Sequence, residues 1–154
     1  MENNIAPQMM TQMLIRKPAA EVFNALIDPT ITTKFWFTKS SGKVETGKEI
    51  LWEWEMYGVS SKIFVKAAKK DEQILFDWGE PSTTVEMKFI PKSADKTLVQ
   101  ISNWGFSGNN DEIMEKALDS MGGFSFLLAS LKALLEHNVV LNLVADHVPD
   151  AHVK

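Results

Sequence analysis

The chain has 154 residues, of which 45% are hydrophobic and 23% are charged, and these values are typical of a single globular domain over residues 1–154. It contains no cysteine, which excludes disulfides, thiolate metal sites and cysteine nucleophiles and agrees with a cytoplasmic location. The net charge of −4 argues against nucleic acid or an anionic membrane surface as the main partner.

The N-terminal part of the chain predicts one strand followed by two short helices. The first ten residues lack the basic region and apolar stretch of a signal peptide, and residues 8–16 are expected to form a strand. Residues 17–29 predict a helix, because Pro18 suits a first helical turn and Pro29 ends it. A second short helix is expected over residues 30–36.

From about residue 43 the hydrophobic period changes from 3.6 to 2, which is typical of strands. Five alternating runs follow, separated by turn signals such as Gly58 and Gly79-Glu80-Pro81. Because short turns join the runs, successive strands should pair antiparallel in one sheet with a single covered face. The side chains expected on that face include Trp52, Trp54, Phe76, Trp78, Met87, Phe89, Ile101 and Asn103.

A long amphipathic helix is expected to cover the sheet. A capping signal at residues 109–111 and an apolar stripe with steps of three or four residues predict a helix that reaches His137. The stripe comprises Ile113, Ala117, Met121, Phe124, Leu128, Leu131 and Leu135. The most apolar run, residues 124–135, is shorter than the ~18 residues needed to span a bilayer, so we expect no membrane insertion. After His137 the chain either extends this helix or folds back.

Two adjacent glycines, Gly122 and Gly123, lie inside this helix, where each costs roughly 1 kcal/mol relative to alanine. Glycine lets a helix approach another backbone closely, and it also leaves space that a side chain would fill. Close packing against the strands or the short helices is the simpler interpretation. The alternative is that the edge of a ligand occupies the space.

Four stretches of the chain carry a family resemblance. In order, they read IRKPAAEVFNALIDPTITTKFWF, VETGKEILWEWEMYG, TLVQISNWGF and GGFSFLLASLKALLE. Their order and spacing over residues 11–137 resemble the START-like (SRPBCC) superfamily, nearest to homologues of the C-terminal domain of the activator of heat-shock protein 90 ATPase. Phe35-Trp36 and Phe124 stand where tryptophans are usual in this family. Asn103 stands where members often carry a bulkier or ionisable polar group.

The resemblance implies an α+β helix-grip fold, also known from the birch pollen allergen. In that fold a seven-stranded antiparallel sheet curls around a long C-terminal helix, two short helices lie between strands 1 and 2, and a cavity lies between sheet and helix. Residues 138–154 would form a tail outside this core. Relatives bind lipids, sterols, polyketides and other hydrophobic molecules, some are enzymes, and the named branch binds and stimulates a chaperone.

Three functions are therefore open: holding a small hydrophobic ligand, acting as a co-chaperone in the stress response, or catalysis in the same cavity by a cyclase or hydrolase. The inward aromatic side chains predict either a cavity for an apolar or aromatic molecule or a solid core. Asn103 either orients a ligand or bonds to backbone or water. The candidate ligand-binding residues are Trp36, Trp52, Trp54, Phe76, Trp78, Met87, Phe89, Ile101, Asn103, Met121, Gly123, Phe124 and Leu128.

No catalytic residue, metal site or cofactor is predicted. Glu53, Glu55 and Asp77 fall on the outer parity of their strands, where solvated carboxylates are expected. The three histidines, His137, His147 and His152, lie at or beyond the end of the long helix and fit no one-face ligand set. The chain contains no phosphate-binding loop and no dinucleotide fingerprint. We expect a monomer or a homodimer.

Overall fold

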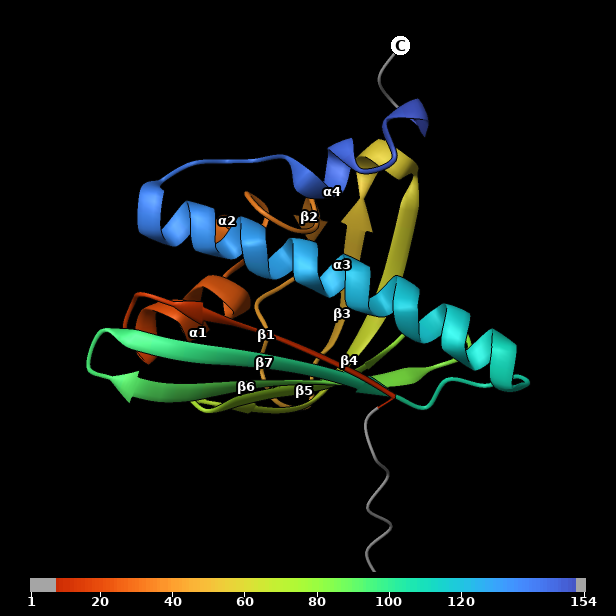
Figure 1. Ribbon diagram of the computed structural model, residues 1–154, viewed down its shortest axis with the longest axis horizontal. Helices are drawn as coiled ribbons and strands as arrows, with labels where there is room; N and C mark the ends of the chain where they lie inside the picture. Colours follow the sequence, from red (N-terminus) through yellow and green to blue (C-terminus); the bar gives the residue numbers. More distant parts are fainter. Residues whose placement is uncertain (1–7, 152–154) are drawn as a thin grey trace, which may run out of the picture.

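In a computed structural model, residues 8–151 form a seven-stranded antiparallel sheet with the spatial order β1-β7-β6-β5-β4-β3-β2 (Figure 1). The strands are β1 (Met9–Ile15), β2 (Lys39–Ser40), β3 (Glu49–Trp54), β4 (Val59–Lys69), β5 (Gln73–Trp78), β6 (Thr83–Ser93) and β7 (Lys96–Trp104). The helices are α1 (Ala19–Ile27), α2 (Pro29–Thr32), α3 (Asn110–His137) and α4 (Leu143–Asp146), with single 3₁₀ turns η1 (Glu55–Tyr57) and η2 (Pro149–Ala151). The expectations for residues 1–7 and for His152 lie outside the described residues.

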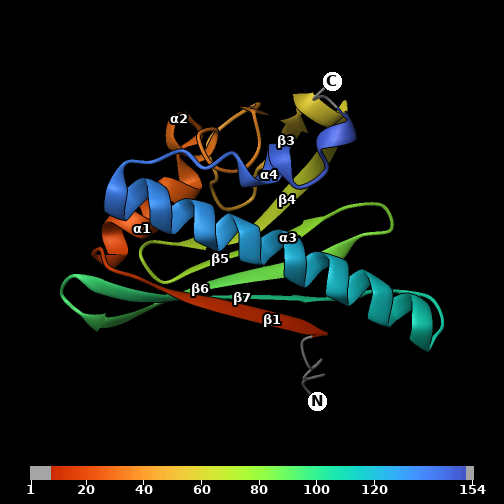
Figure 2. The ribbon, with the colours of Figure 1, turned by 45° about the horizontal axis from the view of Figure 1, so that its top comes forward.

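The α+β helix-grip fold is confirmed. Consecutive strands from β2 to β7 pair as neighbours, and β1 closes the order by pairing with β7, so that Met9 lies opposite Asn103. Helix α3 lies across one side of the curled sheet, and α1 and α2 lie between β1 and β2 in the chain (Figures 1 and 2). Strand β2 has only two residues, and the hydrophobic alternation did not indicate it.

The expected alternation places the apolar side chains of the strands on the side that α3 covers. Along β7, for example, Val99, Ile101 and Asn103 are buried, whereas the residues between them are half-buried. In β4 the register shifts between Val65 and Ala67, so the strict alternation ends there. The buried aromatic and aliphatic side chains form one cluster that α3 completes with Phe124, Leu127, Leu128 and Leu131.

Helix α2 is shorter than the sequence predicted, because it ends at Thr32 and the chain then turns through residues 33–36. The Thr32 hydroxyl donates to the backbone oxygens of Ala25, at 2.6 Å, and Asp28, at 2.9 Å. These bonds tie the end of α2 to α1. The turn that follows delivers Phe35, Trp36 and Phe37 into the core.

Helix α3 is anchored to β1 by charged side chains. The Lys132 ammonium donates to the backbone oxygen of Leu14 and to the carboxylate of Glu136, each at 2.7 Å. The same carboxylate accepts the Arg16 backbone N–H at 2.9 Å. Burial alone would raise the pKa of Glu136, but these hydrogen bonds and the charge of Lys132 outweigh it and hold that pKa below its ordinary value.

Helix α3 is long and apolar enough to cross a membrane by length and composition alone. Its most apolar residues, however, are buried against the sheet, which makes it the core helix of the fold. The helix ends at His137, and Asn138 adopts a left-handed conformation with φ 53°. The chain then folds back, which resolves the choice between extension and return (Figure 2).

Candidate functional site

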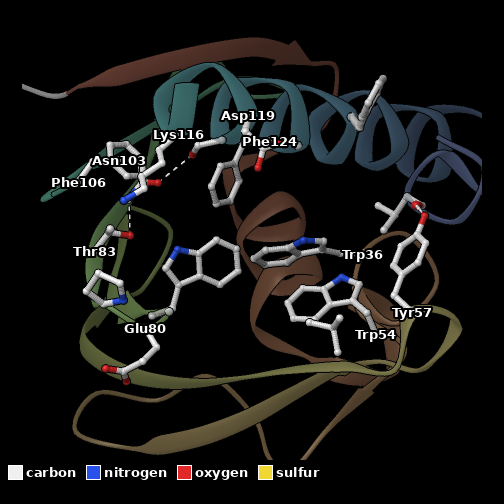
Figure 3. Close-up of a pocket in the computed structure, with 18 of the residues that line it drawn as sticks. Trp36, Trp54, Tyr57, Glu80, Thr83, Asn103, Phe106, Lys116, Asp119 and Phe124 are labelled. Carbon is white, nitrogen blue, oxygen red and sulfur yellow. Dashed lines mark hydrogen bonds between the residues drawn. The ribbon is translucent and has the colours of Figure 1, made fainter. Parts of the chain in front are cut away.

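A pocket of about 530 Å³ opens between α3 and the sheet, on the side of α3 that lies away from β1 (Figure 3). Its walls come from the ends of β3 and β5, the β5–β6 turn, the loop after β7, α3 and α4. The volume lies within the roughly 300–1,000 Å³ that is usual for small-molecule sites. The fold therefore leaves a space under the long helix that its own side chains do not fill.

Aromatic rings form much of the pocket wall. Trp36 lies centrally among them, with ring centroids 6.1 Å from Trp54, 5.9 Å from Trp78 and 5.9 Å from Phe124. These rings come from four separate parts of the chain, because Trp36 follows α2, Trp54 ends β3, Trp78 ends β5 and Phe124 lies on α3. Figure 3 shows Trp36, Trp54 and Tyr57 toward one end of the pocket and Asn103, Thr83 and Glu80 toward the other.

The structure brings six of the predicted ligand-binding residues to this pocket: Trp36, Trp54, Trp78, Asn103, Gly123 and Phe124. Another six are buried in the packed core and do not line it, namely Trp52, Phe76, Met87, Phe89, Ile101 and Leu128. Met121 is different, because it is 37% exposed and does not line the pocket. The two alternatives for the inner face, cavity and solid core, thus each describe part of it.

In the N-terminal half of α3, Lys116, Ser120 and Gly123 line the pocket, whereas Met121 does not. These positions are separated by four and three residues, so they share one face of the helix. Met121 lies about 100° further round the helix than Ser120 and is partly exposed. Within the stripe, Ala117 is partly buried against the core, and the fully buried positions begin at Phe124.

Asn103 bonds to protein groups. Its amide N–H group donates to Thr83 Oγ1 at 3.1 Å and to the Thr84 backbone oxygen at 2.7 Å. Its amide oxygen accepts the Ser120 hydroxyl at 2.8 Å. These bonds tie β7 to β6 and to α3 at one end of the pocket (Figure 3), and contact between Asn103 and a ligand stays a prediction.

The paired glycines do not mediate close packing. A Cβ atom added at Gly122 or Gly123 would meet no atom of the described residues within 4 Å. The interpretation of tight packing against strands or short helices is therefore wrong for both. Gly123 lines the pocket and Gly122 does not, so only Gly123 keeps pocket space open.

Sequence reasoning missed the remaining pocket residues, most of which lie in turns, in the loop after β7, on α3 or in the segment after α3. They are Tyr57, Val59, Gly79, Glu80, Pro81, Thr83, Phe106, Ser107, Lys116, Asp119, Ser120, Phe126, Val144 and His147. A usable signal existed for Ser120 and Lys116, which precede Gly123 at helical spacing. No local signal marks Val144 or His147, because they reach the pocket only after the chain reverses at Asn138.

The ionisable groups that line the pocket are exposed side chains at its edge: Glu80, Lys116, Asp119 and His147. Lys116 donates to the Ser107 backbone oxygen at 2.8 Å. Asp77 does not line the pocket, since it pairs with Lys66 at 3.1 Å and accepts the Thr84 hydroxyl at 2.7 Å. Among residues 8–151, no group of three or more potential metal-ligating side chains is found.

Solved structures of bacterial proteins share this architecture. The protein SSP2350 from Staphylococcus saprophyticus is 28% identical, with a TM-score of 0.76 over 86% of this chain and 94% of that one. The Aha1 dimer from Colwellia psychrerythraea is 16% identical, with a TM-score of 0.72 over 84% and 96% of the two chains. CalU16 from Micromonospora echinospora is 14% identical, with a TM-score of 0.67 over 92% and 82%. The last two likenesses show the fold alone.

The sequence itself identifies the family. No protein with a curated description matches the chain in sequence. The family described as "Activator of Hsp90 ATPase homolog 1-like protein" matches residues 16–136, which is well over half of the chain and includes most of the fold. Together with the helix-grip architecture, this match shows that the chain belongs to the Activator of Hsp90 ATPase homolog 1-like family within the START-like superfamily.

Proposed function

We propose that this protein binds one small, largely apolar or aromatic molecule in the pocket under α3. The observation that carries the proposal is the unfilled space of about 530 Å³ with tryptophan and phenylalanine rings on its walls. Membership of the START-like superfamily supports a ligand-binding domain in general. The kind of ligand follows from the side chains of this chain.

The hydrogen bonds that Asn103 makes within the protein favour a ligand with an apolar body. The amide of Asn103 is already bonded to Thr83, Thr84 and Ser120. The rings of Trp36, Trp54 and Trp78 line the pocket and offer it apolar surface. Burial of apolar surface contributes roughly 25 cal/mol per Å², so affinity should rise with the size of the aromatic part until the pocket is full. Polar substituents of the ligand would lie at the edge, near Glu80, Lys116 and Asp119.

The test is a titration with N-phenyl-1-naphthylamine, a neutral apolar fluorescent probe. We expect saturable binding of one probe per chain, with loss of tryptophan emission as the probe stacks near Trp36, Trp54 and Trp78. At a free probe concentration of about one hundred times Kd, binding should stabilise the fold by roughly 2.7 kcal/mol. For a domain of this size that corresponds to a rise in Tm of about 5–10 °C. Probe fluorescence that does not saturate, with an unchanged Tm, would count against the pocket as a binding site.

A second candidate function is binding to a chaperone, which the family description suggests. An exposed apolar stripe on the outward side of α3 offers a surface for it: Met114 is 64% exposed, Leu118 62% and Met121 37%. The assay is the ATPase turnover of purified Hsp90-type chaperone with and without the protein. Stimulation that is lost in Leu118→Glu, with probe binding retained, would favour this function. Unchanged turnover would remove it.

Oligomeric state and location remain predictions. One relative of the same fold is described as a dimer, and the expectation for this chain is a monomer or a homodimer. Light scattering coupled to size-exclusion chromatography distinguishes the two. The cytoplasmic location rests on composition alone.

A further inference from the structure

The segment after α3, residues 138–151, forms what we call the C-terminal strap. It leaves α3 at Asn138, runs back along that helix and reaches the β3–β4 corner with α4 (Figures 1 and 2). Val144 and His147 of the strap line the pocket. The strap lies beyond residues 16–136, the part of the chain that matches the family.

Hydrogen bonds, a ring contact and the packing of Val144 against the hydrophobic core fasten the strap to the rest of the fold near the pocket. The Tyr57 hydroxyl donates to the backbone oxygens of Val144 and, at 2.9 Å, of Ala145. The rings of Phe126 and His147 lie with centroids 5.0 Å apart at 59°. Tyr57 also lines the pocket beside Trp54, so the fastening lies at the aromatic end of the site (Figure 3).

The remainder of the strap is poorly packed. Val139, Val140 and Leu141 are 44%, 49% and 42% exposed. A small cavity of about 90 Å³ lies between strap residues 141–145 and a wall formed by residues 33–36, Thr38, Met56 and Ser130 of α3. Ser130 of α3 lines this cavity, and its buried hydroxyl has no hydrogen-bond partner among residues 8–151. Few buried apolar contacts and an underlying cavity are characteristic of segments with low local stability.

Two asparagines give the strap its turning points. Asn138 has φ 53° and Asn142 has φ 58°, both in the left-handed region. These positions bracket the exposed residues 139–141 and separate α4 from the end of α3. Changes of backbone angle at a few residues next to regular elements are the usual basis of hinge movement.

We propose that the strap is a movable wall of the pocket, which opens about Asn138 and Asn142, closes through the Tyr57 hydroxyl and so controls the exchange of ligand at the aromatic end. The exchange part of this inference rests on the proposed function, whereas the movement does not. When the strap opens, Val144 and His147 leave the pocket and the cavity around Ser130 becomes accessible to solvent. Trp36, which lines both the pocket and the small cavity, then loses its cover.

The movement is tested by thiol labelling, for which the absence of cysteine from the chain is an advantage. Ser130→Cys places one thiol in the small cavity, is nearly isosteric and removes no hydrogen bond among the described residues. Its labelling rate under native conditions reports opening of the strap. Adding Tyr57→Phe removes the hydroxyl that holds α4, and we expect labelling to accelerate about fivefold, the factor expected for one neutral hydrogen bond.

The control variant is Val99→Cys, a buried position in β7 that the strap does not cover. It reports global unfolding, so Tyr57→Phe should accelerate its labelling far less than that of Ser130→Cys. Two results would overturn the movement. One is a rate for Ser130→Cys that Tyr57→Phe leaves unchanged. The other is an equal acceleration at both positions, because the change would then be global.

The control of ligand exchange is tested with N-phenyl-1-naphthylamine by stopped-flow fluorescence. If the probe binds, Tyr57→Phe should speed its dissociation about fivefold, for the same reason as the labelling. An unchanged dissociation rate overturns the role of the strap in exchange and leaves the proposed function intact. No probe binding in the unaltered protein overturns the proposed function and the exchange role together, while the labelling result still decides the movement.

Discussion

Gly123 gives the most direct test of whether the space under α3 serves a ligand. In Gly123→Leu a four-carbon side chain enters the pocket from a position where an added Cβ meets no described atom within 4 Å. Gly122→Leu is the matched control, since it changes the same residue type one position earlier and that position does not line the pocket. Both glycines lie inside α3 and are exposed.

The two variants should agree in stability and differ in binding. Replacing a helical glycine by leucine favours the helix by about 0.8–1 kcal/mol, so each variant should be more stable than the parent. For a domain of this size the gain corresponds to a rise in Tm of roughly 2–4 °C. In Gly123→Leu the new side chain displaces part of the ligand. If two or three ligand carbons lose their burial, about 2 kcal/mol of binding energy is lost. The Kd then rises roughly thirtyfold.

The assays are thermal unfolding without ligand and titration with N-phenyl-1-naphthylamine. The expected result is a higher Tm for both variants and weaker binding for Gly123→Leu alone. A fall in Tm for Gly123→Leu would refute the interpretation that the space next to Gly123 is open. Equal probe affinity in both variants would refute the role of Gly123 in binding.

Three further predictions concern hydrogen bonds in the fold. Asn103→Ala should destabilise the protein by about 2–3 kcal/mol in urea unfolding, because it leaves Thr84 and Ser120 without a buried partner, whereas Ser120→Ala should cost only about 1 kcal/mol. Glu136→Gln should destabilise the folded protein at pH 7, and the loss of stability should shrink as the pH falls below 4.5, the ordinary pKa of a glutamate. The reason is that the folded-state pKa of Glu136 lies below this value, so the stabilisation that its carboxylate provides is lost as the carboxylate becomes protonated. An equal loss of stability at pH 7 and pH 3 would contradict this. Ser130→Ala should raise the free energy of unfolding by about 1 kcal/mol, since it removes a buried hydroxyl without a partner among the described residues; a loss of stability would mean that the hydroxyl is bonded in solution.

The apolar stripe of α3 shows how far local patterning could predict the site. From Phe124 to Leu131 the expected residues are buried, because the helix there lies directly on the sheet. One turn earlier Met121 is 37% exposed, although Ala117, before it on the same stripe, packs against the core. A hydrophobic period indicates which side of a helix is apolar, but it does not indicate where the opposing surface ends.

The sequence by itself determined the strand alternation, the two short helices, the long C-terminal helix and the family. These features depend on periodicity, turn residues and spacing within one stretch of chain. Only the tertiary structure decided that Trp36, Trp54 and Trp78 line a pocket while Trp52 and Phe76 fill the core. All five belong to apolar segments, and their different roles follow from which distant elements lie opposite.

The tertiary structure also decided the roles of Asn103, Gly123 and the C-terminal strap. The bonds of Asn103 join three elements that are adjacent only after the sheet has curled. The space at Gly123 is visible only when α3 and the pocket walls are in place. Val144 and His147 reach the pocket because the chain reverses at Asn138. Such long-range arrangements depend on how whole elements pack against one another, and no single stretch of sequence specifies them.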